Sequence, residues 1–471
     1  MIGTVTDLLR IPHVFAKNCE HLAAHALGRV VTDSREAKQG DVFVAFRGAR
    51  VDAHDFVAEL CARGVLLCVV ENRWYRKHAA EITELPLLVV RDTMRAYGDI
   101  ARLHRERFTV PVLAVTGSNG KTTTKEMIAA VLRTKYRVLQ NAGNFNNHIG
   151  LPATLLELTD AHDVVVAEMG TNQPGDIAYL CTIAQPTHGL ITNIGRAHIE
   201  KLRSREGIAQ EKAALFAALS PQDLALVNAD EPLLRGTVPR GVRRITYGTR
   251  AGSDIRITDV TLDRAGRARV RIEAPRFVRR PVMLRLQAVG RHAAYNAAAA
   301  LAAGFAFGCG IRAMKRAVEH VASYDKRMQI SDAAGITVIN DTYNANPDSV
   351  LAALDLLQQL DIPGRRCVVL GDMLELGTVS RQEHEAIGAA LVAADIPYVM
   401  TYGTRSRAIS SAARSMAAVS RHFTDKQRLV DELAALLDAG DAVLIKGSRS
   451  MKMEEIVDGF LRRSTSEEER A

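Results

Sequence analysis

The stretch Pro111–Met127, PVLAVTGSNGKTTTKEM, decides how the rest of the chain is interpreted. Its apolar, partly β-branched run Val112–Val115 predicts a buried strand, and the segment from Lys121 onward is rich in helix formers. Between them, Gly117–Gly120 (GSNG) predicts a tight turn that bulky side chains would obstruct. A strand, a glycine turn and a helix start together present backbone N–H groups and the positive end of a helix dipole to an anion. The stretch therefore predicts a phosphate-binding loop.

Two side chains after the turn suit a nucleotide triphosphate and its metal ion. Lys121 brings a full positive charge, and Thr122 brings a hydroxyl placed for Mg²⁺. The strict phosphate-loop pattern has a glycine five residues before Gly120. This chain has Val115 there, so the loop is a shortened G-x-x-G-K-T variant. A chance glycine turn is the alternative, but it does not explain why strand, turn, lysine and threonine-rich helix start coincide.

The composition is that of an ordinary globular protein. A length of 471 residues corresponds to about three domains. Lys and Arg outnumber Asp and Glu by 61 to 53, a net charge of +8, but aromatic residues make up only 5%. Without aromatic residues interleaved with basic ones, a nucleic-acid platform is disfavoured, and an acidic small substrate or a solvated surface explains the excess as well.

Cysteine usage and hydropathy predict the compartment. The six cysteines are scattered without a C-x-x-C pair, and the N-terminus lacks the basic-then-apolar pattern of a signal peptide. No apolar stretch approaches the ~20 residues that span a bilayer. We therefore expect a cytoplasmic monomer with reduced thiols, no membrane insertion and no nucleic-acid partner.

Strand and helix patterns alternate along the chain and predict an α/β fold of three domains. Residues 1–108 form a small α/β module, and residues 109–325 build a mostly parallel sheet around the phosphate loop. Within the latter, the alternation of polar and apolar residues at about 254–288 predicts an antiparallel insertion. Residues 326–471 repeat the α/β rhythm.

Polar residues follow several predicted strands, where open α/β sheets bind their ligands. Glu168 closes the strand predicted at Asp163–Ala167 and can hold a hard cation, unless it is simply a solvated strand end. His198 lies at another strand exit, and Lys212 lies in a helix predicted at Gly207–Leu219. Taken alone, these two are more often a hydrogen-bonded loop histidine and a solvated helix lysine.

Further polar groups offer less specific signals. Ser34 and Arg35 can grip a phosphate, although an Asx turn with a solvated arginine explains them equally well. Asn296 can read a base edge or merely cap a helix. Asp341 ends a strand, a place where a ribose hydroxyl can be bound, and the turns that follow it resemble either ligand loops or ordinary βα turns.

Together these strings resemble the Mur ligases, ATP-dependent enzymes that build the peptide stem of bacterial cell-wall precursors. The resemblance covers nearly the whole chain in order, and its motifs are TGSNGKTTTKEM, NNHIGLP, YNANP, GDMLELG and KGSRSMKME. The last three point to the member that adds D-alanyl-D-alanine to a UDP-N-acetylmuramoyl-tripeptide. The resemblance implies a UDP-substrate-binding domain at 1–108, an ATP-binding P-loop domain at 109–325 and a Rossmann-like ligase domain at 326–471.

The resemblance also implies roles for individual residues. The residues expected to bind ATP are Gly117, Ser118, Asn119, Gly120, Lys121, Thr122, Thr123, Asn296 (adenine), Arg327 (γ-phosphate) and Asp341 (ribose). Those expected to bind the other substrates are Ser34, Arg35, Asn146, Asn147, Asn344 and Lys446. The Mg²⁺ ligands expected are Thr122, Glu168, His198 and Lys212, and the catalytic residues are Lys121 and Lys212.

Lys212 matches the family's carbamylated lysine. An ammonium group beside two Mg²⁺ ions is strongly repelled, so burial and these cations lower its pKa and give a neutral amine that captures CO₂. The carbamate then offers oxygens to the metal.

Three other functions stay open at this stage. A sister Mur ligase adds a single amino acid, although its D-N-P-R motif is absent from the last domain. From another class, a basic P-loop ATPase stimulated by nucleic acid is compatible with the loop, and so is a nucleotide-binding regulator without turnover. The low aromatic content and the second metal-ligand set disfavour these last two.

Overall fold

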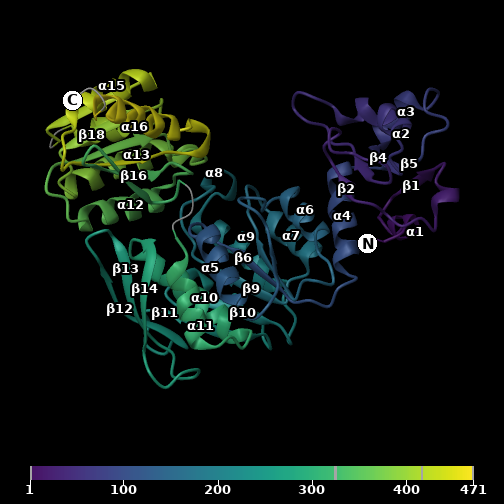
Figure 1. Ribbon diagram of the computed structural model, residues 1–471, viewed down its shortest axis with the longest axis horizontal. Helices are drawn as coiled ribbons and strands as arrows, with labels where there is room; N and C mark the ends of the chain where they lie inside the picture. The colour runs from purple at the N-terminus through teal and green to yellow at the C-terminus, as the bar shows by residue number, and fades with distance from the viewer. Residues whose placement is uncertain (1–2, 323–325, 415–416, 469–471) are drawn as a thin grey trace. The chain divides into compact units, whose positions relative to one another are not determined.

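The computed structural model describes residues 3–322, 326–414 and 417–468. Three sheets with helices between them make up an α/β fold (Figure 1). By its contacts the chain divides into two compact units. The first comprises Met1–Ala114, Tyr136–Gly170 and Asp176–His188, and the second Val115–Lys135, Thr171–Gly175 and Gly189–Ala471. The predicted α/β class, with mostly parallel sheets, is confirmed.

The first unit contains a five-stranded sheet in the order β1-β5-β4-β3-β2, in which β1 alone runs antiparallel to its neighbour. Alternate residues of each inner strand face two separate apolar clusters, so the strands are nearly continuous apolar runs. The strands are β1 (Phe15–Lys17), β2 (Val30–Val31), β3 (Val42–Val44), β4 (Leu67–Glu71) and β5 (Leu87–Val90). The helices are α1 (Val5–Leu8), α2 (Val57–Ala62), α3 (Asn72–His78) and α4 (Thr93–Arg105).

The next sheet has nine strands in the order β14-β13-β12-β11-β10-β9-β6-β8-β7. Its strands are β6 (Val112–Thr116), β7 (Val138–Gln140), β8 (Val164–Glu168), β9 (His188–Ile191), β10 (Leu224–Asn228), β11 (Arg243–Gly248), β12 (Ile255–Leu262), β13 (Arg267–Glu273) and β14 (Val282–Val289). β12, β13 and β14 are antiparallel, which confirms the predicted insertion. Buried and exposed residues alternate along β13 and β14 because only one face is covered.

Seven helices accompany this sheet: α5 (Lys121–Leu132), α6 (Gly150–Leu156), α7 (Asp176–Ala184), α8 (Ile199–Leu202), α9 (Arg205–Ala217), α10 (His292–Ala306) and α11 (Ile311–His320). α10 packs along α5, the helix that follows the glycine turn (Figure 1). Its alanine-rich sequence allows this, because small side chains let two helix backbones approach closely.

The C-terminal sheet has six strands in the order β15-β16-β20-β17-β18-β19, all parallel except the β15–β16 hairpin. Its strands are β15 (Gln329–Ala333), β16 (Ile336–Asp341), β17 (Arg366–Gly371), β18 (Tyr398–Tyr402), β19 (Val419–Phe423) and β20 (Ala442–Lys446). Its helices are α12 (Pro347–Gln359), α13 (Ser380–Ala393), α14 (Arg407–Ala413), α15 (Lys426–Leu436) and α16 (Glu454–Glu468).

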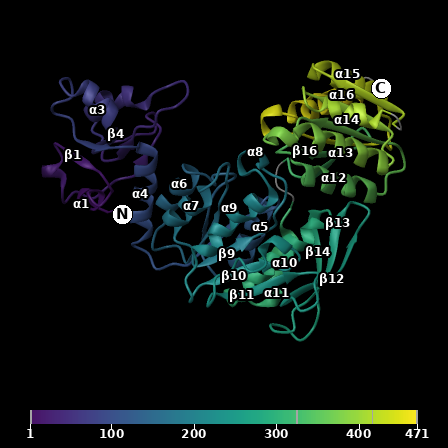
Figure 2. The same ribbon diagram turned by 180° about the vertical axis from the view of Figure 1, so that it is seen from behind.

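Helices cover both faces of this C-terminal sheet. α12 and α13 lie on one face and α15 and α16 on the other (Figures 1 and 2), each pair over its own apolar cluster. This is a doubly wound sheet, in agreement with the Rossmann-like domain that the family resemblance implies. The strand order reverses around β20, and ligands of such sheets bind outside the carboxyl ends of the strands at that point.

The predicted elements are found within two residues of their expected ends. The largest shift in a helix is α9, predicted at Gly207–Leu219 but observed from Arg205. It begins earlier because the Ser204 hydroxyl accepts a hydrogen bond from the Gly207 N–H at 3.1 Å and caps the helix.

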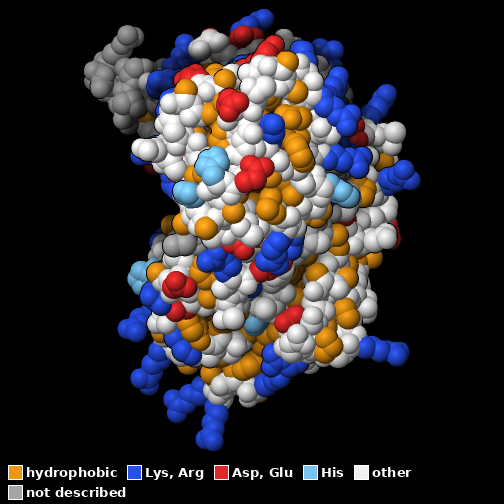
Figure 3. Space-filling view, turned by 90° about the vertical axis from the view of Figure 1, so that its right-hand side faces the viewer, with side chains coloured by type: hydrophobic (Ala, Val, Ile, Leu, Met, Phe, Trp, Pro, Cys, Tyr) orange, Lys and Arg blue, Asp and Glu red, His pale blue; other side chains and the backbone are white. Residues whose placement is uncertain are grey.

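Within the described part of the chain, no helix combines the length and the apolar character needed to cross a bilayer. On the face drawn in Figure 3, Lys and Arg side chains are spread among Asp, Glu and apolar groups. On this face the basic excess is therefore dispersed, with charges of both signs side by side.

Candidate active site

The loop between β6 and α5 has the predicted strand, glycine turn and helix geometry. Gly117 has φ of +148°, and a Cβ there would lie 1.8 Å from Thr192 Oγ1. Gly120 has φ of +78°, and its Cβ would lie 2.9 Å from Asn296 Oδ1. Both positions therefore need glycine. Because α5 begins at Lys121, the N–H groups of its first turn lack intrahelical acceptors and suit an anion.

The first half of the loop is held by the protein itself. The Ser118 N–H donates to Asn193 O and the Asn119 N–H to Asn193 Oδ1, each at 3.0 Å. The Ser118 hydroxyl accepts from the Gly195 N–H at 2.8 Å. Ser118 and Asn119 thus fix the shape of the turn, and their predicted contact with ATP stays a prediction.

Two cations lie at the second half of the loop. Lys121 Nζ donates to Gly117 O at 2.9 Å, so the side chain folds back over its own turn. Arg327, from the C-terminal region, donates to Thr122 Oγ1 at 3.0 Å and stacks on Tyr343, with 3.8 Å between guanidinium carbon and ring centre. A cation thus already contacts the hydroxyl predicted to bind Mg²⁺, which shows that this oxygen is accessible to a positive group.

Lys212 is buried within α9, with 1% of its surface exposed. Among the described residues its ammonium group has no hydrogen bond or ion pair. Burial, together with the nearby charge of Lys121, holds the pKa of this amine well below its ordinary value, and Glu211 only partly opposes the shift. The alternative of a solvated helix lysine is therefore wrong. A neutral buried amine is the chemical form that adds CO₂.

Glu168, at the end of β8 in the first unit, is also buried, at 1% exposed. Its Oε1 accepts from Asn146 Nδ2 at 2.7 Å, whereas its Oε2 has no hydrogen-bond partner. The alternative of a solvated strand end is wrong here as well. A buried carboxylate oxygen without a partner fits a hard cation. Asn147, in the same motif, lies just before α6, and its Oδ1 accepts from the N–H groups of Ile149 and Gly150.

His198 begins α8 with φ of +59°, and its Nδ1 lies 2.5 Å from Glu375 Oε2. The hydrogen bond from His198 lowers the pKa of Glu375 below its ordinary value. The structure thus shows a loop histidine paired with a carboxylate, and the metal role of His198 stays a prediction. Among the described residues, no three His, Cys, Asp or Glu side chains gather at one point.

Three of the predicted substrate and ribose residues lie together at the carboxyl ends of β16 and β20. Lys446 Nζ donates to Asp341 Oδ2 at 2.5 Å and to Asn344 O at 2.8 Å. The other Asp341 oxygen accepts from the Met328 N–H at 3.1 Å. This is the switch point of the doubly wound sheet, so the position predicted for ligand contacts has the side chains that such contacts need.

Asn296 lies on α10 beside the glycine turn. Its Oδ1 accepts from the Thr124 hydroxyl at 3.1 Å, while its Nδ2 is buried without a partner. A buried amide that has lost water and gained no partner is costly, so this N–H₂ group fits a ligand acceptor such as a base nitrogen.

At the predicted uridine site of the first unit, the Arg35 N–H donates to Asp33 Oδ1 at 2.9 Å, which forms an Asx turn. The Arg35 guanidinium pairs with the same carboxylate and is mostly exposed. The Asx-turn alternative is thus what the structure shows, and the phosphate contact of Ser34 and Arg35 stays a prediction.

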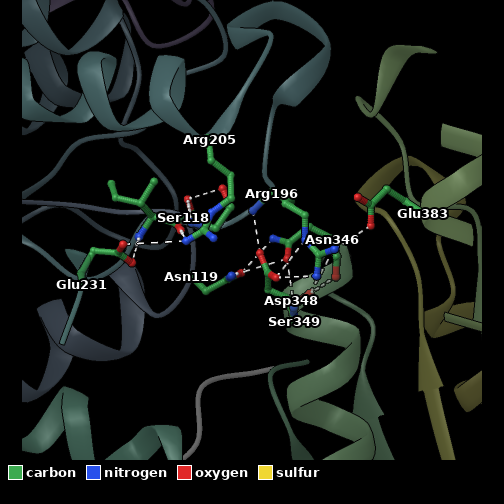
Figure 4. Close-up of polar contacts among 11 residues, drawn as sticks. Ser118, Asn119, Arg196, Arg205, Glu231, Asn346, Asp348, Ser349 and Glu383 are labelled. Carbon is green, nitrogen blue, oxygen red and sulfur yellow. Dashed lines mark hydrogen bonds and ion pairs between the residues drawn. The ribbon is translucent and has the colours of Figure 1, made fainter. Parts of the chain in front are cut away.

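Figure 4 shows a cluster that the sequence interpretation missed, formed by Asn119, Arg196, Asn346, Asp348 and Glu383. The only signal available was the string NPDS, which is typical of a capped helix start. Asn346 does cap α12, because its Oδ1 accepts from the Ser349 N–H at 2.9 Å. Nothing in the sequence indicated that Arg196 would reach this helix.

Family comparison defines the class to which this fold and site belong. The Mur ligase middle domain matches residues 115–304, and the Mur ligase glutamate ligase domain matches residues 326–449. The chain belongs to the Mur ligase family.

Individual relatives are more specific. UDP-N-acetylmuramoyl-tripeptide–D-alanyl-D-alanine ligases from Bacillus subtilis and Escherichia coli are each 36% identical to this chain over 437 residues, covering 92% of it and 93% of the relative. Among solved structures, MurF from Acinetobacter baumannii has a TM-score of 0.87 at 31% identity, covering 98% of this chain and 99% of its own. MurF ligase from Thermotoga maritima in complex with ADP has a TM-score of 0.82 at 28% identity, covering 94% and 98%.

Proposed function

We propose that this chain is an ATP-dependent ligase that joins D-alanyl-D-alanine to UDP-N-acetylmuramoyl-tripeptide, with release of ADP and phosphate. The observation that carries the proposal is the Gly117–Gly120 turn running into α5 with Lys121 folded over it. This phosphate-binding geometry occurs in a chain that aligns over nearly its full length with ligases of that name.

ATP is the first substrate. The N–H groups of the first turn of α5 face its phosphates, and Lys121 moves from Gly117 O to the transferring group. The free Nδ2 of Asn296 supports a contact with adenine, and the carboxylate of Asp341 supports one with ribose. Arg327, already beside Thr122, supplies charge to the γ-phosphate.

The reaction activates a carboxylate. An oxygen of the tripeptide's terminal carboxylate attacks the γ-phosphorus, the bond to the β-phosphate oxygen breaks, and ADP leaves. The amine of D-alanyl-D-alanine then attacks the acyl carbon, loses a proton, and phosphate departs. Lys121 and the loop N–H groups stabilise the charge that develops on the phosphoryl oxygens, and removing one such donor typically costs about 10²–10³ in rate.

Mg²⁺ fits the donors present, since Thr122 offers a hydroxyl and Glu168 a buried carboxylate oxygen without a partner. Thr122, Glu168, His198 and a carbamylated Lys212 are the ligands we propose, and bound Mg²⁺ neutralises phosphate charge. The buried, unpaired amine of Lys212 supports the modification. The carbamate adds oxygens without adding positive charge.

The remaining roles follow the order of the chain. Residues 1–108 bind the UDP end of the substrate through Ser34 and Arg35, and the Arg35 guanidinium leaves Asp33 to bind the nucleotide. Residues 109–325 bind ATP, and residues 326–471 form the ligase domain, which also contributes Arg327 and Asp341 to the ATP site. The other proposed substrate contacts are Asn146, Asn147, Asn344 and Lys446, of which the last two lie together at the switch point.

A coupled ADP-release assay tests the proposal. The purified protein is given ATP, Mg²⁺, a UDP-N-acetylmuramoyl-tripeptide and, in parallel, D-alanyl-D-alanine, D-alanine or other single amino acids. We expect ADP release only with the dipeptide, together with a product heavier by the dipeptide less water. ADP release with a single amino acid would make the protein a sister ligase, and ADP release driven by DNA or RNA would refute the ligase assignment.

A further inference from the structure

The nucleotide loop is bonded to the N-terminus of α12 by a reciprocal pair of amides (Figure 4). Asn346 Nδ2 donates to Asn119 Oδ1 at 2.8 Å, and Asn119 Nδ2 donates back to Asn346 Oδ1 at 3.4 Å. Asn119 belongs to the glycine turn and Asn346 caps α12. The turn that faces the phosphates therefore contacts the C-terminal region through a side chain two residues from Lys121.

Arg196 makes a second and stronger connection beside the first. Its Nε and Nη2 donate to Asp348 Oδ1 at 3.1 and 2.8 Å, and its backbone N–H donates to Asp348 Oδ2 at 2.6 Å. The remaining branch, Nη1, donates to Glu383 Oε2 at 2.9 Å. One arginine thus binds carboxylates of both α12 and α13 through charge-assisted bonds.

The backbone around Arg196 is adapted to this contact. A Cβ on Gly195 would lie 2.6 Å from Asp348 Oδ2, so a side chain there would block the carboxylate. The Gly195 N–H donates to the Ser118 hydroxyl, and the preceding Ile194 N–H donates to Glu231 Oε2 at 3.0 Å. The segment 194–196 therefore connects the nucleotide loop on one side with α12 on the other.

We propose that Arg196 is a positioning residue, which holds the start of α12 against the nucleotide loop before ATP arrives. The C-terminal region carries Arg327, Asp341 and Lys446, so fixing α12 keeps these ligand-binding groups assembled around the loop. This inference rests on the proposed function only in assuming that the protein binds ATP to ligate its substrates. We call the contacts of Arg196 with Asp348 and Glu383 the clasp. Nucleotide affinity and the radius of gyration test the clasp even if the acceptor is not D-alanyl-D-alanine.

The expected effect follows from population arithmetic. Without the clasp, only a fraction of the molecules have α12 held against the nucleotide loop. The apparent Kd for nucleotide then equals the intrinsic Kd divided by that fraction, so it rises. Saturating substrates still drive assembly, so kcat changes little while KM for ATP rises. Coupling of this kind typically amounts to about fivefold or more.

The test is a double-mutant cycle with Arg196→Met, Asp348→Asn and the double variant. Affinity for a non-hydrolysable ATP analogue is measured by calorimetry, and the radius of gyration by X-ray scattering with and without the analogue. We expect Arg196→Met to raise Kd about fivefold or more and to expand the protein in the absence of ligand but not at saturation. The double variant should be no worse than the more affected single variant.

Arg381→Met is the matched control. Arg381 pairs with Glu385 one helical turn away on the exposed side of α13, with 86% of its side chain exposed, so its loss should change neither readout. Unchanged affinity and shape in Arg196→Met, or additive effects of the two substitutions, would overturn the proposal. If Arg196→Met does not fold, Arg196→Lys replaces it, because lysine keeps the charge but loses the branched guanidinium. Arg196→Lys must then raise the Kd and expand the protein in the same direction, by smaller amounts.

Discussion

A buried ion pair lies at each end of strand β20, and the two pairs differ in how fully their polar atoms are hydrogen-bonded. Asp441, just before the strand, is buried and accepts from the Arg365 N–H at 2.6 Å, from its Nη2 at 2.6 Å and from the Asp438 N–H at 2.9 Å. Lys446, at the other end, is equally buried but shares one short contact with Asp341 and one with Asn344 O. Each is a buried ion pair between neighbouring strand ends.

The difference lies in what surrounds each pair. The oxygens of Asp441 are fully used by its own chain. Elsewhere in the same unit, Asn296 Nδ2 and Arg327 Nε are buried without hydrogen-bond partners, and the buried amine of Lys212 has only the partly opposing charge of Glu211. Underpaired polar groups cost stability, so they persist where a ligand completes them. We therefore expect the amino edge to serve folding and the carboxyl edge to serve binding.

The largest effect that sharpens this contrast is expected for Lys121→Ala. The side chain lies over the glycine turn and should stabilise the transferring phosphoryl group, so turnover should fall by about 10²–10³. Because Lys121 is not part of an apolar cluster, the melting temperature should stay close to that of the wild type. Single-turnover ADP release and a thermal melt on the same preparation measure both.

Near-normal turnover of Lys121→Ala would remove the loop from the chemistry. A large loss of stability at unchanged turnover would mean that Lys121, like Asp441, mainly stabilises the fold. It would contradict the proposed difference between folding residues and ligand-binding residues.

Lys212→Met should lower turnover without lowering the stability of the protein. If Lys212 carries the proposed carbamate, its loss should lower turnover at least as much as loss of an outer-shell partner of a metal, about 10- to 100-fold. Methionine fills a similar volume without a buried unpaired amine, so the free energy of unfolding should stay the same or rise. Turnover with and without bicarbonate, and a denaturant titration, measure the two.

A chemical denaturation curve shifted to lower stability would mean that Lys212 has a structural partner. Bicarbonate-independent full activity in Lys212→Arg, which cannot form the carbamate, would refute the modification.

The sequence predicted those parts of the site that follow from local chain properties. The glycine turn, the helix at Lys121 and the strand ends at Glu168 and Asp341 each depend on a few consecutive residues, and all are found in the structure. Arg196 was missed because its partners lie 152 and 187 residues further along the chain. A lone arginine in a loop gives no local signal of a partner, since only tertiary packing brings α12 and α13 to it.

The burial of Glu168 and Lys212 was likewise beyond the sequence pattern. Each was assigned a solvated alternative, because a charged residue at a strand end or on a helix is usually exposed. For Lys212 the family resemblance indicated burial, which the structure shows, whereas hydrophobic periodicity alone did not.

Asp441→Asn should affect stability alone. The substitution removes the charge from a buried group with several donors, so the free energy of unfolding should fall by roughly 1–3 kcal/mol. Arg365 is about one-third exposed, and solvent moderates the loss on its side. Turnover per folded molecule should be unchanged, because no ligand contact is expected at this edge. Urea unfolding and the ADP-release assay check both, and lowered turnover at full occupancy of the folded state would break the contrast.

The smallest expected effect is the pH dependence of the difference in free energy of unfolding between the wild type and Asp441→Asn. Burial by itself would raise the pKa of Asp441, but hydrogen bonds from Arg365 and Asp438 outweigh it, and the pKa falls below the ordinary value of 3.8. A carboxyl whose pKa is lower in the folded than in the unfolded protein contributes stability above the unfolded value, and this stability is lost as the pH falls through the folded one. The gap between wild type and Asp441→Asn should therefore be constant above about pH 5. It should shrink below 3.8, since a protonated aspartate resembles asparagine. Urea titrations of both proteins across this range measure the gap, and one that widens in acid would show that burial, not the arginine, dominates at this end of the strand.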